Sequence, residues 1–341
     1  WGHDFRTSYL FLGRNATLFA KTQSGQPITL FGLTATASYD VLADIQRELS
    51  GDIYNKDSIL SDDAVIRFET FNRPELQYEV KEVNIQADNP YRDDWEVKKA
   101  LGAAKYSTIV DLLSTMPSRI ADLNLDAESV YIPITDYEIS EDRIEEICQS
   151  IGIQNYNPEY FWREDNANAG IVFCPHRSWL FGVTDKYKGG NRDHHNGIAD
   201  TIGAVIPHPN IKIGTFLGVD QDSSSQSEQE TDNQNNQDSF INSDLNLMVC
   251  TKAFGMGIDK PDLRLLVHLS LPRSFEDYYQ EVGRAGRDGK DSQVVTLWRG
   301  ADYRTQSFLI DQQPDPGYRE AAMRRLNRMY DALRSTHCVW K

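Results

Sequence analysis

The sequence has few cysteines, no long apolar run and none of the short motifs that bind nucleotide phosphates. Its four cysteines are scattered, which excludes a disulfide scaffold or a complete zinc ribbon within the chain and suits a reducing compartment. No apolar stretch approaches the ~18 residues that a membrane-spanning helix needs. Neither G-x-x-x-x-G-K-[ST] nor a D-E-x-H or D-E-x-D box occurs, so a phosphate cradle with its lysine and a Mg²⁺-binding acid are absent from these residues.

What is present predicts a folded protein of two or three domains. The 341 residues are 40% hydrophobic and 11% aromatic, which is enough for a sizeable core. The chain begins at Trp1 without a signal or transit pattern and stops at Lys341 inside a predicted helix. We therefore expect it to be an excerpt of a longer protein.

The net charge of −16 is concentrated in two blocks. Residues 84–165 hold 17 acidic and 7 basic side chains, and residues 220–244 hold 7 acidic and no basic ones. The rest of the chain carries about +1 in total, so it can still bind phosphate locally. We interpret residues 84–165 as an acidic insertion, either structural or partner-binding. Residues 221–239 contain no hydrophobic residue and predict a disordered loop.

Strand-like and helix-like segments alternate along the second half of the chain, which predicts a parallel α/β sheet. The expected strands cover residues 170–174, 211–217, 245–250, 263–269 and 293–298, with a helix near 274–284. A further helix is predicted between 95 and 115. Residues 317–341 predict an arginine-rich amphipathic helix, whose apolar face comprises Met323, Leu326, Met329, Tyr330 and Leu333.

The most informative block covers residues 249–289 and ends in Q-x-x-G-R-x-G-R. Two arginines three apart on a helix, Arg284 and Arg287, would face the same way and reach a common anion. Guanidinium groups suit phosphate oxygens, and the intervening glycines permit close approach of the backbone. An isolated R-x-x-R would more simply be a solvated basic helix end, but the length of the whole block favours a function.

This block resembles motifs V and VI of superfamily 2 helicases, and in detail those of the RecQ family of DNA helicases. Four other stretches resemble the same family in the same order. WGHDFR (1–6) resembles its aromatic-rich loop, LTATA (33–37) its motif III, FNRPEL (71–76) the segment that joins its two lobes, and GIVFCPHR (170–177) its motif IV. The resemblance covers roughly residues 1–83, 166–219 and 240–341.

The resemblance implies a motor of two RecA-like lobes with ATP in the cleft between them. Arg287 would be the arginine finger, and Arg284 its neighbour on the γ-phosphate. The remaining nucleotide-side residues would be Gln280, which would help place the nucleotide or water, with Asp259, Gly257 and Gly283. In the family, the phosphate cradle and the Mg²⁺-binding acid lie upstream of WGHDFR.

On the nucleic-acid side, the family's aromatic-rich loop senses DNA and couples it to ATP hydrolysis. Aromatic rings and a guanidinium plane can stack on unpaired bases. The residues concerned are Trp1, His3, Phe5 and Arg6, although the same residues would also fit an ordinary chain start with buried aromatics. Thr251 and Lys252 would lie at the DNA side of motif V. Thr34 and Thr36 would link hydrolysis to lobe movement.

Metal sites are not expected within the chain. Cys338 stands where RecQ proteins place the first cysteine of a zinc-binding module, but one cysteine cannot hold structural zinc, so alone it would be a half-buried thiol. The adjacent His194 and His195 lie in a Gly/Asn-rich stretch that is typical of a loop.

The sequence as a whole predicts an α/β fold with a RecA-like parallel sheet flanked by helices. The expected parts are the end of a first lobe (1–74), a complete second lobe (75–303) and the start of a helical, zinc-module-like region (304–341). The implied function is an ATP- and Mg²⁺-dependent helicase that moves 3′ to 5′ on single-stranded or forked DNA, in the nucleoid or the nucleus. An RNA helicase, a translocase that does not unwind and an ATP-independent binding module remain alternatives.

Overall fold

The structure is a computed structural model. It describes residues 12–26, 28–32, 42, 45–47, 49–50, 60–65, 73–83, 85, 100–101, 104–105, 108–109, 112, 168–178, 182–184, 197–205, 211–218, 226–254 and 258–335. The chain divides into two compact units, residues 1–72 and 73–341. The described elements of the first unit are α2 (Leu12–Phe19) and the short η2 (Asp62–Ala64). The boundary between the units falls within the FNRPEL segment.

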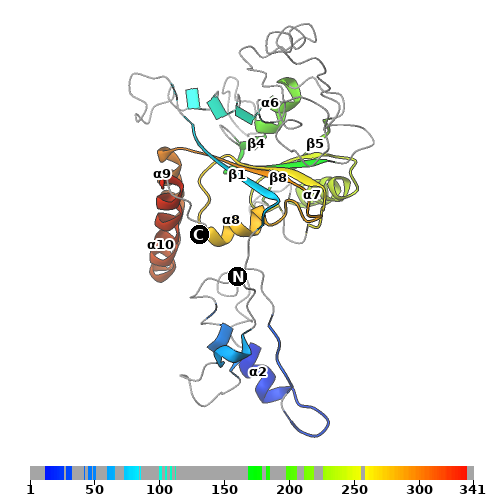
Figure 1. The fold of residues 1–341 in the computed structure, drawn as a ribbon, viewed down its shortest axis with the longest axis vertical. Coiled ribbons are helices and arrows are strands. Elements are labelled where there is room, and N and C mark those ends of the chain that lie inside the picture. Colours follow the sequence, from blue (N-terminus) through cyan, green and yellow to red (C-terminus); the bar gives the residue numbers. More distant parts are fainter. Residues whose placement is uncertain are drawn as a thin grey trace. The chain divides into compact units, whose positions relative to one another are not determined.

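The second unit is built on a six-stranded sheet in which every neighbouring pair is parallel (Figure 1). The strand order is β1-β8-β7-β2-β6-β5. The bounds are β1 (Leu76–Glu82), β2 (Ala169–Phe173), β5 (Ile213–Phe216), β6 (Leu247–Cys250), β7 (Leu263–His268) and β8 (Ser292–Trp298). A small parallel pair, β3 (His176–Ser178) and β4 (Gly182–Thr184), stands apart from this sheet.

Helices cover both faces of the sheet, and this explains why its central strands are continuous apolar runs. A parallel sheet buried on both faces needs apolar side chains at successive positions, and β2, β6, β7 and β8 are buried at every position. One core cluster joins a sheet face to α6 (Ile198–Val205). A second cluster joins residues of the sheet to α7 (Gln226–Ile241), α8 (Phe275–Val282), α9 (Gly300–Asp311) and α10 (Pro316–Arg334).

The structure confirms the predicted RecA-like class, a parallel sheet flanked by helices. The five expected strands correspond to β2, β5, β6, β7 and β8. The amphipathic helix is α10, in which Leu326 and Met329 are fully buried while Met323, Tyr330 and Leu333 pack against the same core. Among the described helices, none is both long and apolar enough to cross a membrane.

The prediction of a disordered loop over residues 221–239 is wrong from Gln226 onward, because this stretch forms most of helix α7. Helix α7 covers β5, the last strand of the sheet, and its amide side chains pair with backbone groups in and just after that strand. The amide of Asn233 both accepts from Leu217 N at 3.0 Å and donates to Leu217 O at 2.7 Å. Asn236 donates to Thr215 O at 2.9 Å. The polar composition therefore satisfies an edge strand's exposed backbone.

We predict that Asn233→Ala lowers the free energy of unfolding by about 1–3 kcal/mol, because it leaves both backbone groups of Leu217 without their partner. Asn233 is 6% exposed. The matched control is Asn235→Ala, since Asn235 is an exposed asparagine on the same helix. Urea unfolding of the two variants provides the comparison. Equal effects would show that α7 does not depend on this amide pairing.

Part of the segment interpreted as an acidic insertion, residues 84–165, belongs to the core of the second unit. Leu101, Ile109 and Leu112 lie on helical residues between 100 and 112 and are buried in the same cluster as α6. Lys105, on the same stretch, is fully buried and donates to Leu269 O and to both carboxylate oxygens of Asp302. The described residues agree with the helix predicted between 95 and 115, in which Leu101, Ile109 and Leu112 are among the candidate buried positions.

Candidate functional site

Helix α8 leads directly into the two candidate arginines. Ser274 caps its N-terminus by accepting from Asp277 N at 3.1 Å, and Tyr278 and Val282 are buried against the sheet. The helix ends at Val282, with Gly283 as its C-cap. A Cβ at Gly283 would lie 3.0 Å from Tyr279 O, so a larger residue would be crowded at this cap. Arg284 and Arg287 therefore lie in the turns after α8, and the expectation that one helix carries both is wrong.

Arg287 is the more exposed of the two arginines. Its Nη1 donates to the carboxylate of Asp259 at 2.8 Å, and the two side chains are 37% and 76% exposed. An ion pair this exposed contributes less than about 1 kcal/mol. The guanidinium can therefore exchange the carboxylate for phosphate oxygens at little cost.

The side chain of Arg284 is less exposed than that of Arg287 and lies close enough to feel its charge. Burial lowers the pKa of its guanidinium, the positive charge of Arg287 lowers it further, and Glu281 opposes both effects. Its Nε is shielded from solvent and has no hydrogen-bond partner. An unpaired donor of this kind costs free energy unless a ligand completes it, and an anion is the natural partner for a guanidinium N–H.

The structure places the other predicted residues at both ends of α8. Gln280 lies in the last turn of the helix, next to the arginines. Lys252 lies near the opposite end, with Nζ 4.0 Å from the carboxylate of Asp277 in the first turn. Thr251 accepts from Gly218 N at 3.0 Å. The Lys252 ammonium thus lies near the first turn of α8, whereas the two arginines follow its last turn.

Several predicted residues lie outside the described part of the chain, and their roles stay predictions. They are Trp1, His3, Phe5, Arg6, Thr34, Thr36, Gly257 and Cys338. Within the described residues, no three His, Cys, Asp or Glu side chains are grouped so that they could hold a metal ion.

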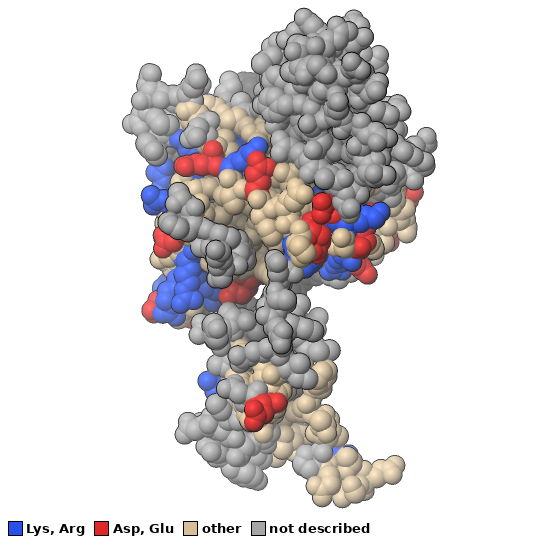
Figure 2. All heavy atoms as spheres, in the orientation of Figure 1, with Lys and Arg blue, Asp and Glu red and all other residues tan. Residues whose placement is uncertain are grey.

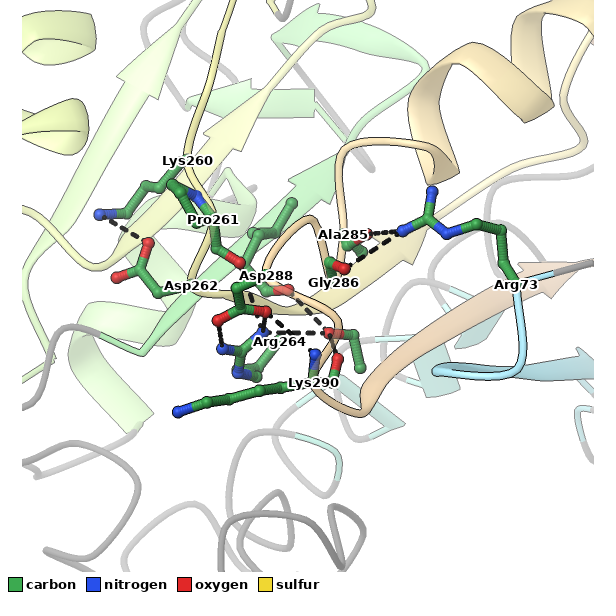
Figure 3. A network of polar contacts seen from close by, with 11 residues as sticks. Arg73, Lys260, Pro261, Asp262, Arg264, Ala285, Gly286, Asp288 and Lys290 are labelled. Atoms are coloured by element: carbon green, nitrogen blue, oxygen red, sulfur yellow. Dashed lines mark hydrogen bonds and ion pairs between the residues drawn. The ribbon is translucent and has the colours of Figure 1, made fainter.

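A network of polar contacts fixes the turn that carries Arg287 (Figure 3). Arg264, buried in β7, donates to both oxygens of Asp288, one at 3.0 Å. Burial alone would raise the pKa of Asp288, but the hydrogen bonds from Arg264 and from Lys290 N hold it below its usual value. Arg73 approaches the same turn from another direction and donates to Ala285 O at 2.8 Å and to Gly286 O at 3.3 Å.

Gly286 is required by the shape of this turn. Its φ of +60° is a left-handed conformation that costs a residue with a side chain about 1–2 kcal/mol. A Cβ there would also lie 3.0 Å from Lys290 O and 3.1 Å from Glu75 Cγ. The glycine thus permits both the turn and its close contact with the start of β1.

We expect Gly286→Ala to destabilise the protein more than Gly289→Ala, by at least about 1 kcal/mol. Gly289 has a φ of +78°, so the backbone cost is similar, but nothing lies within 4 Å of an added Cβ. The difference isolates the effect of crowding around Gly286. Chemical unfolding of both variants measures it, and identical stabilities would refute the crowded turn.

A buried pair behind α8 was not found from the sequence. His268, at the end of β7, has Nε2 2.7 Å from a carboxylate oxygen of Glu281, and its ring stacks on Phe173 with centroids 5.3 Å apart. Its Nδ1 is buried without a partner. An Nε2–H tautomer fits both observations, because it donates to Glu281 and leaves Nδ1 as an acceptor only.

Two signals in the sequence could have pointed to these contacts. Arg264 and His268 interrupt the apolar strand LRLLVH, and a buried charged residue in such a strand needs a partner. Asp288 follows Arg287 directly, yet nothing local shows that it faces Arg264. The resemblance identified the arginine pair, whereas the residues that hold its turn in place are spread along the chain.

Comparison with known proteins agrees with this geometry. The family model named Helicase conserved C-terminal domain matches residues 218–289, which include α7, α8 and the arginine turn. The ATP-dependent DNA helicase RecQ of Haemophilus influenzae is 36% identical over 338 residues, 99% of this chain and 37% of that protein. RecQ of Bacillus subtilis is 33% identical over 205 residues, 57% of this chain and 32% of that protein.

A putative ATP-dependent DNA helicase Q1 of Caenorhabditis briggsae is 28% identical over 316 residues, 92% of this chain and 34% of the relative. The chain thus spans about a third of the length of these relatives. The similarity includes the whole motif V and VI block, and the structure brings the arginines of that block together on a parallel-sheet lobe. These similarities support the assignment of the chain to the RecQ family of superfamily 2 helicases, as a C-terminal part of the helicase motor.

Proposed function

We propose that the protein containing this chain is an ATP-dependent DNA helicase, and that residues 73–341 supply the arginine half of its ATP site. The observation that carries the proposal is Arg284, whose shielded Nε lacks a partner beside the readily exchangeable guanidinium of Arg287. Arg287 acts as the arginine finger and Arg284 binds next to it on the γ-phosphate. Such groups stabilise charge on the transferring phosphoryl group.

The residues around Arg284 and Arg287 suit the binding of a nucleoside triphosphate. ATP supplies the phosphoryl group, and the two guanidinium groups offer bidentate donors to its oxygens. Gln280 helps to place the nucleotide or the attacking water. Asp259 orients Arg287, and with Gly257 and Gly283 it lines the nucleotide side. Mg²⁺ is held mainly by residues of the parent protein outside this chain.

DNA binding is proposed at separate places. Thr251 and Lys252 contact the DNA backbone, and Trp1, His3, Phe5 and Arg6 stack on unpaired bases, while Thr34 and Thr36 couple hydrolysis to movement. Figure 2 shows basic side chains gathered along α10, which carries five arginines and two acidic residues. A basic surface on so acidic a chain suits a polyanion, and binding should weaken as salt rises.

The proposal extends to the direction of movement, a zinc module and a protein partner. Movement is 3′ to 5′ on single-stranded or forked DNA, and Cys338 provides the first ligand of a zinc module completed elsewhere in the parent protein. A protein partner would bind the acidic segment 84–165 away from Leu101, Ile109 and Leu112, because these side chains are buried in the core.

A strand-displacement assay with the natural-length protein tests the function. With ATP and Mg²⁺, we expect release of a strand from a forked duplex with a 3′ single-stranded tail, and much less from one with a 5′ tail. ATP hydrolysis on DNA without strand release would indicate a translocase, and stronger stimulation by RNA an RNA helicase. DNA binding without hydrolysis would establish the binding-module alternative and overturn the proposal.

A further inference from the structure

Arg73 is the first residue of the second unit, where the chain arrives from Asn72. Its guanidinium contacts the turn that carries the candidate arginines, more than 200 residues away in sequence. The two acceptors are the carbonyl oxygens of Ala285 and Gly286, at 2.8 and 3.3 Å from Nη2. These are the two residues between Arg284 and Arg287. Figure 3 shows the guanidinium directed at both carbonyl groups.

The same short segment meets the turn at two more points. Glu75 pairs with Nε of Arg73, and its backbone oxygen accepts from Ser292 N at 2.8 Å. Its Cγ is one of the atoms that an added Cβ at Gly286 would touch. The beginning of β1 and the arginine turn therefore interlock through a guanidinium, a backbone hydrogen bond and a close packing contact.

The hydrogen bonds of Arg73 are better suited to orienting the arginine turn than to stabilising the fold as a whole. The Arg73 side chain is 28% exposed, so desolvation takes little from the charge-assisted hydrogen bonds. Nη2 donates to two successive carbonyl groups while Nε pairs with Glu75, and this planar arrangement fixes the orientation of both peptide planes. The two planes lie in the backbone between Arg284 and Arg287, so they fix how these residues are directed relative to each other.

We propose that Arg73 is a positioning residue for ATP hydrolysis, because it holds the peptide groups between Arg284 and Arg287 in the orientation that aims both guanidinium groups at the phosphates. The inference rests on the proposed ATPase function. It assigns Arg73 no contact with the nucleotide. It also ties the arginine pair to the point where the chain enters the second unit, so a change there is transmitted to the pair.

The test compares Arg73→Ala and Arg73→Lys with the control Lys81→Ala in the natural-length protein. Lys81 is also on β1, but it lies near the far end of that strand from the turn, where it pairs with the neighbouring Glu79 at 3.0 Å. We expect Arg73→Ala to lower kcat for DNA-stimulated ATP hydrolysis about 10²-fold, the scale of a misplacement of about 1 Å. KM for ATP should stay near that of the wild type. Arg73→Lys should fail similarly, because a single ammonium cannot hold Glu75 and both carbonyl groups in the planar arrangement of the guanidinium.

Thermal unfolding and amide hydrogen exchange separate positioning from general stability. Faster exchange of the amides of residues 285–289 in Arg73→Ala than in Lys81→Ala, with unchanged exchange in β7, supports the proposal. Wild-type kcat in both Arg73 variants would overturn it, as would a loss of activity that only follows the unfolded fraction. A wild type without ATPase activity would refute the proposed function, and unaltered exchange in the turn would then refute the role of Arg73 independently.

Discussion

Replacing Arg287 with alanine should lower DNA-stimulated ATP hydrolysis by the natural-length protein by a factor of about 10³ to 10⁵. Among the described residues, the side chain is anchored by an exposed ion pair to Asp259 and by a long contact of 3.5 Å from Nε to Gly283 O. The residue therefore contributes little to folding, and its loss should act on the transition state. Because the charge develops on the phosphoryl group during transfer, kcat should fall far more than the affinity for ATP.

Two variants sharpen this prediction. Arg287→Lys keeps the positive charge but loses the planar donors, so it should recover only a small part of the rate. Arg324→Ala is the matched control, since Arg324 is also an exposed arginine with a single ion pair, to Glu320 at 2.8 Å on α10. Steady-state kinetics with saturating single-stranded DNA give kcat and KM for each. If Arg287→Ala hydrolysed ATP as fast as Arg324→Ala, the arginine-finger role would be refuted.

Replacing Lys105 with methionine should lower the free energy of unfolding by about 3–5 kcal/mol, the scale for breaking a buried ion pair from one side. The Lys105 side chain is 1% exposed, and its Nζ lies 3.1 Å from a carboxylate oxygen of Asp302 that is itself 11% exposed as a side chain. Methionine fills a similar volume but removes the ammonium from Leu269 O and from the carboxylate, which keeps the hydrogen bond from Arg299 N at 3.0 Å. The main cost is a buried negative charge that has lost its ion-pair partner.

Lys81→Met provides the comparison, because Lys81 pairs with Glu79 where both side chains are about one third exposed. That substitution should cost less than about 1 kcal/mol. Urea denaturation followed by far-ultraviolet circular dichroism measures both variants. A similar small loss for the two would show that the ion pair between Lys105 and Asp302 does not fasten this part of the segment 84–165 to the core of the second unit.

The strands could be predicted because their environment is simple. Strands β2, β6, β7 and β8 lie inside a sheet covered on both faces, so their local sequences are nearly continuous apolar runs. Helix α7 could not be predicted in this way. Its amide side chains are polar in the sequence and become partners of β5 only after the chain folds. Composition alone cannot distinguish such a helix from a solvated loop.

The candidate site also contains a part that could be predicted from the sequence and a part that could not. The arginine pair could be identified because both residues lie in one short block that resembles a known family. The contacts that hold the arginine turn in place could not be identified, because each of them joins distant parts of the chain. Asp288 meets Arg264 across 24 residues, and the turn meets Arg73 across more than 200. Helix α8 ends at Val282, before both arginines, and the left-handed Gly286 lies in the turn that carries Arg287.

The central claim is that this chain holds the arginine half of a DNA-stimulated ATP site. ATP hydrolysis with and without single-stranded DNA, measured side by side for the 341-residue chain and the natural-length protein, tests it most directly. The account predicts DNA-stimulated hydrolysis by the natural-length protein and almost none by the chain alone, since the sequence contains no phosphate-binding loop. If both proteins bound single-stranded DNA but neither hydrolysed ATP, the claim would be contradicted and a nucleic-acid-binding module would take its place.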